Sequence, residues 1–203
     1  MKVLVACEFS GTVRDAFIKR GHDAISCDLL DSESEGPHYK GDVNDLLKQK
    51  FDLMIAHPPC TYLTNSGVKH LHTDLSRWFK MFEAATFFKT LLNAPNIKHI
   101  AVENPIMHRY ARAIIGQRQS QIVQPWMFGH MESKATGFWL QNLPPLFETL
   151  NVKQDMEQLP NKEKFKVHYA SPGKDRWKRR SVTCQGIADA VAEQWGDYIS
   201  MAR

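Results

Sequence analysis

The sequence lacks the features that define several protein classes. Its four cysteines lie far apart and form no CxxC pair, so neither a disulfide framework nor a zinc ribbon is predicted, and we expect no metal ion. No apolar run approaches the roughly 18 residues of a membrane span, and the first residues do not resemble a signal peptide. We therefore expect a cytoplasmic protein that has no membrane partner.

A GxGxxG motif is also missing, because Gly11 stands alone in the loop after the first expected strand, residues 2–7. A dinucleotide cofactor is therefore disfavoured. Residues 13–20 have helical periodicity and end at Gly21, which suits a left-handed helix cap. The order strand, turn and helix is typical of an α/β protein, and the length of 203 residues predicts a single domain.

The most informative stretch is the apolar run of residues 53–56, which leads into Pro58, Pro59 and Cys60. Such a run predicts a strand that is buried on both faces of a parallel sheet. The prolines fix φ and lack an N–H group, so the strand ends there and Cys60 lies on a stiff loop. Ligands bind at this edge of open α/β sheets, which makes Cys60 a candidate nucleophile. A buried structural cysteine is the alternative interpretation.

Polar side chains stand at the ends of other expected strands. Asp28 and Asp42 end the second and third strands, and Glu103 and Asn104 follow the fifth. Because the carboxyl ends of parallel strands meet at one edge of the sheet, we expect these side chains on the same side as Cys60. An acid in the position of Asp28 is suited to holding an adenosine ribose.

The remaining pattern completes an α/β fold with a mostly parallel sheet, helices on both faces and a β-hairpin at one edge. A long helix is expected over residues 74–92, with Trp78, Phe82 and Phe88 among the residues that pack on the sheet. The strands expected after it are 97–102 and the hairpin pair 121–129 and 136–140. We divide the chain into a core, an irregular polar region and a closing helical segment, residues 1–150, 151–183 and 184–203.

Positive charge is concentrated in residues 162–180, which carry eight basic and two acidic side chains. This charge indicates a phosphate-bearing partner, because neutralising phosphates releases counterions. The interleaved aromatic residues, such as Trp177, are suited to stacking on bases. A solvated, lysine-rich loop is the alternative. The candidate nucleic-acid-binding residues are Lys174, Arg176, Lys178, Arg179 and Arg180.

Six of these features, in chain order, resemble the motifs of the DNA cytosine-5 methyltransferases, and in particular the short methyltransferase-like proteins of phages and prophages. The resemblance covers residues 1–145 and 184–196. The motifs are Phe9-Ser10-Gly11, Asp28, Asp42, Pro58-Pro59-Cys60, Glu103-Asn104 and the Gly-Ile-Ala helix that starts at Gly186. The resemblance implies a Rossmann-like S-adenosylmethionine-dependent methyltransferase fold, with the protein located in the cytoplasm of a bacterial host or a phage-infected cell.

The resemblance also implies catalytic roles. Cys60 matches the nucleophile that adds to C6 of cytosine, and Glu103 matches the acid at N3, which requires a raised carboxyl pKa in a closed site. Asn104 would hold the local loop geometry. Lys134 lies in the place of a family arginine that contacts O2 of the base.

The same resemblance implies a site for the cofactor, S-adenosyl-L-methionine. Asp28 would bind its ribose hydroxyls and Asp42 its adenine. The other cofactor-binding residues would be Glu8, Phe9, Ser10, Gly11 and Pro58.

One departure from the family leaves the substrate open. Family members carry a long target-recognition domain, whereas only residues 151–183 are available here. The sequence therefore predicts C5 methylation of cytosine in DNA with low or short sequence specificity. The alternatives are methylation of free deoxycytidine monophosphate, a degenerate nucleic-acid-binding module and amino methylation of a nucleobase. The last of these is considered because His57-Pro58-Pro59-Cys60 is similar to the Asp-Pro-Pro-Tyr loop of amino methyltransferases.

Overall fold

A single seven-stranded sheet runs through the protein, whose computed structural model describes residues 1–201. The strand order is β3-β2-β1-β4-β5-β7-β6. The first five strands are parallel, and β7 runs antiparallel to both β5 and β6. This confirms the expected mostly parallel, Rossmann-like sheet with an antiparallel pair at one edge. The strands are β1 Lys2–Ala6, β2 Asp23–Asp28, β3 His38–Lys40, β4 Phe51–Ala56, β5 Ile97–Pro105, β6 Gln121–Val123 and β7 Thr136–Gln141.

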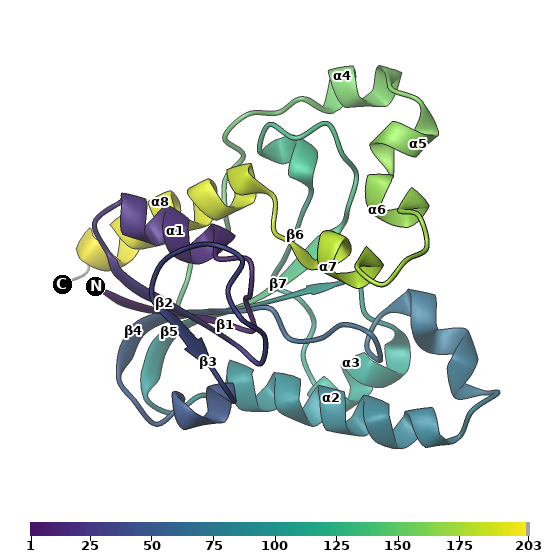
Figure 1. Ribbon diagram of the computed structural model, residues 1–203, viewed down its shortest axis with the longest axis horizontal. Coiled ribbons are helices and arrows are strands. Elements are labelled where there is room, and N and C mark those ends of the chain that lie inside the picture. Colours follow the sequence, from purple (N-terminus) through teal and green to yellow (C-terminus); the bar gives the residue numbers. More distant parts are fainter. Residues whose placement is uncertain (202–203) are drawn as a thin grey trace.

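Helices cover both faces of this sheet. In Figure 1, α1 and α8 lie on one face, and α2 and α3 lie on the other. The α-helices are α1 Thr12–Lys19, α2 Ser76–Leu92, α3 Arg109–Ile115, α4 Lys153–Gln158, α5 Asn161–Lys164, α6 Lys166–Tyr169, α7 Arg176–Ser181 and α8 Gln185–Met201. Three short 3₁₀ helices are η1 Val43–Asp45, η2 Asn65–Leu71 and η3 Pro125–Met127. None of the helices within residues 1–201 combines the length and apolar character needed to cross a membrane.

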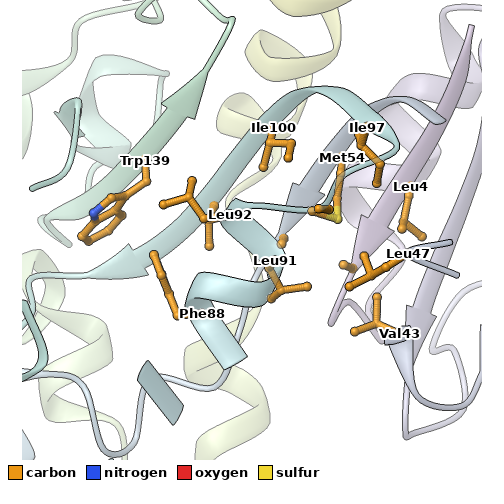
Figure 2. Packing of buried hydrophobic residues seen from close by; sticks show 14 of the residues in the cluster. Leu4, Val43, Leu47, Met54, Phe88, Leu91, Leu92, Ile97, Ile100 and Trp139 are labelled. Atoms are coloured by element: carbon orange, nitrogen blue, oxygen red, sulfur yellow. The ribbon is translucent and has the colours of Figure 1, made fainter. Parts of the chain in front are cut away.

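The strand residues divide the core into two apolar layers. Successive side chains of a strand point to opposite faces, so Met54 packs with the layer of α2 whereas Leu53 packs with that of α1 and α8. Figure 2 shows the first layer, in which Phe88 of α2 lies beside Trp139 of β7, their ring centroids 4.9 Å apart. Because β4 is covered on both faces, its sequence is a continuous apolar run.

The first turns of α2 differ from the expectation. Phe82 is 58% exposed and does not pack on the sheet. Trp78 contacts Tyr110 of α3 instead, with ring centroids 4.9 Å apart. The buried residues of α2 begin at Met81 and continue with Ala85, Phe88, Leu91 and Leu92. The helix therefore extends beyond the sheet at its N-terminal end, where α3 is its neighbour.

The polar region is also more ordered than the expected irregular segment. Residues 151–183 contain the four short helices α4 to α7, which form an arc above the sheet in Figure 1. Part of the basic charge holds this arc together, because Arg176 Nε donates to the carbonyl oxygen of Ala170 at 2.7 Å. Side chain-to-backbone contacts of this kind carry no hydrophobic periodicity, so the sequence pattern does not reveal them.

Arg14 organises the loop between β2 and β3 from a fully buried position. Its guanidinium donates to Ser26 Oγ at 3.1 Å, Ser34 Oγ at 2.6 Å and the carbonyl oxygen of Glu35 at 2.8 Å. It also forms an ion pair with Asp15, with an Nε–Oδ1 distance of 2.7 Å. Removing this side chain would leave the buried Ser26 Oγ and several partly buried oxygens without their donor.

We predict that Arg14→Ala lowers the free energy of unfolding by about 3 kcal/mol or more, because it removes several hydrogen bonds to a charged group, each worth about 1.5–3 kcal/mol. The matched control is Arg20→Ala, near the other end of α1, whose side chain is 35% exposed and pairs with Asp197 at 3.1 Å. That change should cost less than about 1 kcal/mol. Urea unfolding followed by circular dichroism measures both, and equal losses would contradict a structural role for Arg14.

Candidate active site

Neighbouring strands end in the same row at the carboxyl edge of the sheet. The last hydrogen-bonded row of the four central strands consists of Cys27, Ala6, Ala56 and Val102. The next row therefore consists of Asp28, Cys7, His57 and Glu103. The strand order reverses between β1 and β4, which is where ligands bind in such sheets.

Two adjoining pockets open along this row. The first is here called the Cys60 pocket and the second the acidic pocket. Both are lined by Cys7 and Pro59. The predicted catalytic residues Cys60, Glu103, Asn104 and Lys134 all line the first pocket, together with His57, Pro58, Ser10 and Arg180.

Asn104 holds the loop that carries Cys60. Its Nδ2 donates to the carbonyl oxygen of Pro58 at 3.0 Å, and the residue is only 1% exposed. The backbone N–H of His57 donates to Ala6 at 2.9 Å, so the pairing of β4 with β1 continues to the start of the double proline. The loop is thus fixed to both neighbouring strands, and Cys60 has little backbone freedom.

His57 and Glu103 form a pair that the sequence did not predict. Nδ1 of His57 lies 3.0 Å from Oε2 of Glu103, and the side chains are 10% and 16% exposed. Nε2 of His57 is buried and has no hydrogen-bond partner within residues 1–201. A sequence signal for this pair does exist, because His57 and Glu103 each directly follow the apolar run of a strand, and the two strands are neighbours in the parallel sheet.

The electrostatics of the Cys60 pocket differ from the expectation in one respect. Burial raises the pKa of Glu103, but the hydrogen bond and charge of His57, with the charge of Lys134, outweigh it and lower the pKa below its ordinary value of 4.5. The expected raised pKa is therefore wrong for the protein without substrate. Burial and the charge of Glu103 raise the pKa of the Cys60 thiol above its ordinary value of 9.0, opposed by Lys134 and Arg180.

The loop after β1 lines the Cys60 pocket with Glu8, Phe9 and Ser10, rather than the acidic pocket. The Glu8 carboxylate accepts the N–H groups of Val13 at 2.7 Å and Arg14 at 3.2 Å, so it caps α1. Ser10 donates to Glu8 at 3.3 Å. Gly11 lines neither pocket. Its φ of 75° is left-handed, and a side chain there would meet Ser34 and Arg14. The glycine is needed for this loop packing.

The acidic pocket fits a nucleoside. Asp28 and Asp42 line it, and carboxylates accept hydrogen bonds from sugar hydroxyls. The apolar side chains of Leu29, Val43 and Phe87 line the same space and can flank a flat ring. The adenosine part of S-adenosylmethionine carries both kinds of group. No cluster of three or more His, Cys, Asp or Glu side chains that could hold a metal ion is present in residues 1–201.

Helix α7 covers the Cys60 pocket from the other side. Lys134 Nζ donates to the carbonyl oxygen of Arg180 at 3.0 Å. The ring of Trp177 lies 5.9 Å from that of Phe9, and Lys178 Nζ lies 3.1 Å from Oε1 of Glu33. The basic segment is thus attached to the loops after β1 and β2, with Arg180 at the pocket.

The predicted nucleic-acid-binding residues have different surroundings. Arg176, Lys178 and Arg179 contact other parts of the protein, the last by donating to the carbonyl oxygen of Ser171 at 3.4 Å. Lys174 is exposed in the turn before α7. Part of the positive charge therefore stabilises residues 151–183, here called the basic lobe, and Arg180 lines the Cys60 pocket.

Comparison with known proteins adds the following. No protein-family model matches the sequence, and no curated protein is similar to it. Solved structures that are similar in fold include the methyltransferase EhMeth of Entamoeba histolytica, at 17% identity and a TM-score of 0.48 over 74% of this chain and 57% of that one. The Dnmt2 methyltransferase of S. pombe has 15% identity and a TM-score of 0.40, over 97% and 66%. WbdD, solved with a kinase inhibitor, has 12% identity and a TM-score of 0.41, over 68% and 35%. The chain thus spans between about a third and two thirds of these proteins.

We predict that the Glu103 carboxyl has a pKa below its ordinary value of 4.5. The pairing of Glu103 with His57 therefore stabilises the fold above pH 4.5, and this stabilisation is lost as the pH falls through the pKa of the folded protein. His57→Ala should raise the midpoint, because the burial that opposes ionisation remains. Lys134→Met, which removes a smaller contribution, should raise it less. Carbon-13 NMR titration of the carboxyl group measures each midpoint. A midpoint unaffected by His57→Ala would contradict the pairing.

Proposed function

We propose that the protein is an S-adenosylmethionine-dependent methyltransferase that methylates C5 of cytosine in DNA. The observation that carries this proposal is the junction of the two pockets at Cys7 and Pro59. A group transfer requires two reactants to meet at a fixed distance. The acidic pocket suits the nucleoside of a methyl donor, and the adjoining pocket contains a cysteine, a carboxylate and an amine around a space for an acceptor.

Each residue of the Cys60 pocket has a chemical role in this reaction. C5 of cytosine is a poor nucleophile, and addition of Cys60 Sγ to C6 moves the C5–C6 electron pair so that C5 can attack an electrophile. S-adenosylmethionine would supply that electrophile as the methyl group on its sulfonium sulfur, and would leave as the neutral thioether S-adenosylhomocysteine when the bond from methyl carbon to sulfur breaks. The C5 proton then leaves to water and the bond from Sγ to C6 breaks, which releases the base.

Glu103 and Lys134 would orient the base. Glu103 is ionised at neutral pH, so it accepts a hydrogen bond from the 4-amino group, and it can share a proton with N3 once the base is bound. The Lys134 ammonium would donate to O2 and stabilise the negative charge that develops on the ring. Asn104 keeps the Cys60 loop in place through its bond to Pro58. Asp28 and Asp42 would hold the cofactor.

The basic lobe would bind the DNA backbone. Its position over the Cys60 pocket supports this role, because a base turned out of a helix remains attached to phosphates near the mouth of the site. The lobe is small, so low or short sequence specificity is expected. Free deoxycytidine monophosphate is the second candidate substrate, since Arg180 lines the same pocket as Cys60, within reach of a single nucleotide.

We predict a covalent adduct between Cys60 and an oligonucleotide containing 5-fluorocytosine when S-adenosylmethionine is present. Fluorine at C5 cannot leave as a proton, so the bond from Sγ to C6 persists. Cys60→Ser should form no adduct, whereas Cys184→Ser should form it normally. Denaturing gel electrophoresis and peptide mass spectrometry measure the product.

The same assay tests the acidic pocket. Asp28→Ala should require more S-adenosylmethionine for half-maximal adduct, by about tenfold or more, because a hydrogen bond to a charged group is worth about 1.5–3 kcal/mol. Asp31→Ala, which removes an exposed carboxylate that pairs with Lys40, should leave that concentration unchanged. Adduct formation by Cys60→Ser, or without any cofactor, would contradict the proposed function.

A salt titration separates DNA from a free nucleotide as the substrate. Binding to several phosphates gives a log–log slope of affinity against salt of about −0.9 per phosphate on duplex DNA and about −0.7 on single strands. We predict a slope steeper than about −2 in fluorescence anisotropy. Replacing Lys174, Lys178 or Arg179 by alanine should reduce the slope by about one unit for each of them that binds a phosphate. A shallow slope that these substitutions do not change would favour deoxycytidine monophosphate.

A further inference from the structure

His57 is a polar side chain of the Cys60 pocket to which the proposed function assigns no role. Its Nδ1 lies 3.0 Å from Oε2 of Glu103. The side chain is only 10% exposed, and Nε2 is buried without a hydrogen-bond partner among the described residues 1–201. Leaving a buried polar atom unpaired costs free energy, and a ligand or proton that the atom exchanges is one explanation for its presence in a pocket.

The partner at Nδ1 decides which nitrogen of the ring is basic. An ionised carboxylate only accepts hydrogen bonds, so the proton between His57 and Glu103 lies on Nδ1. In the neutral ring, Nε2 then has the free electron pair. Cys60, three residues further along the chain, lines the same pocket, and Nε2 accepts no hydrogen bond from its Sγ in the protein without substrate. A thiol, a base and a carboxylate that orients the base are the three groups that activate thiols in enzymes.

We propose that His57 is the general base that takes the proton from Cys60 Sγ. The cytosine acceptor in this step rests on the proposed function. The S–H bond breaks and an N–H bond forms at Nε2, while Sγ bonds to C6 and the C5–C6 electron pair moves toward C5, C4 and N3. When the bond from Sγ to C6 breaks at the end of turnover, its electron pair returns to sulfur and His57 returns the proton.

The charges around His57 suit this transfer. Glu103 faces it from β5 and stabilises the positive imidazolium that the step creates. Lys134, before β7, and Arg180 of α7 stabilise the developing thiolate. The other titratable groups of the pocket are Glu8, whose carboxylate is bound by the N-terminus of α1, and Cys7, which burial keeps as a thiol. The pocket thus contains one unpaired basic nitrogen for one thiol that must lose a proton.

The test is the rate of Cys60 alkylation by iodoacetamide as a function of pH, measured by peptide mass spectrometry without cofactor or DNA. The wild-type rate should depend on His57, because the base draws the proton from the thiol. His57→Ala and His57→Gln should react about 100-fold more slowly at pH 7, the lower end of general base effects, and their rates should change with pH differently from the wild-type rate. His57→Gln keeps a donor for Glu103, so a purely structural role would leave its rate unchanged.

Chemical rescue provides a second readout. Imidazole added to His57→Ala should restore the rate in proportion to its concentration, whereas His57→Gln, whose side chain fills the space, should not respond. The control is His99→Gln, a buried histidine at the other end of β5 that is bonded to the carbonyl oxygen of Asn142 at 2.7 Å. It should retain the wild-type profile.

Identical pH profiles in the wild type and both His57 variants, with no response to imidazole, would overturn the assignment of the base. Failure of the proposed function looks different. If 5-fluorocytosine gives no adduct while alkylation still depends on His57, the base stands and cytosine is not the electrophile.

Discussion

The register of the parallel strands is the constraint on which the site depends. Ala56 of β4 pairs with Val102 of β5, so the next residues, His57 and Glu103, must lie side by side. Residues in the same row of a sheet point to the same face, and this brings the imidazole and the carboxylate to 3.0 Å. A shift of either strand by one residue would turn one of the two side chains to the other face. The continuous apolar core on both sides of β4 opposes such a shift.

The same row explains why two cysteines at one sheet edge have different chemistry. Cys7 ends β1 in a left-handed conformation with φ of 58°, and burial together with the charge of Asp28 raises the pKa of its thiol strongly. It forms the boundary between the two pockets and remains neutral. Cys60 is displaced from the row by two prolines, close enough to Lys134 and Arg180 for their charges to oppose the effect of burial. Burial raises the pKa of both thiols, and in Cys60 nearby cations oppose this rise whereas in Cys7 acidic neighbours add to it.

The basic lobe acts on the site through shape as well as charge. Its arginines are partly used to bind carbonyl oxygens of the lobe, as Arg176 does with Ala170. The cation–π contact of Lys178 with Phe9, at 5.4 Å, attaches α7 to the loop after β1. A segment built in this way covers the Cys60 pocket with a positively charged surface.

Local signals in the sequence were sufficient to predict the strands, the helices on both faces and the residues at the strand ends, because apolar runs, prolines and polar residues mark these elements directly. Cys60, Glu103 and Asn104 could therefore be predicted as neighbours from their places at strand ends, whereas Lys134 was predicted only through the resemblance to the cytosine-5 methyltransferases. The folded chain was needed to establish that His57 pairs with Glu103, that the latter is ionised, and that residues 176–181 form a helix over the pocket. These properties arise from strand register, burial and contacts between distant segments, none of which has a periodicity along the sequence.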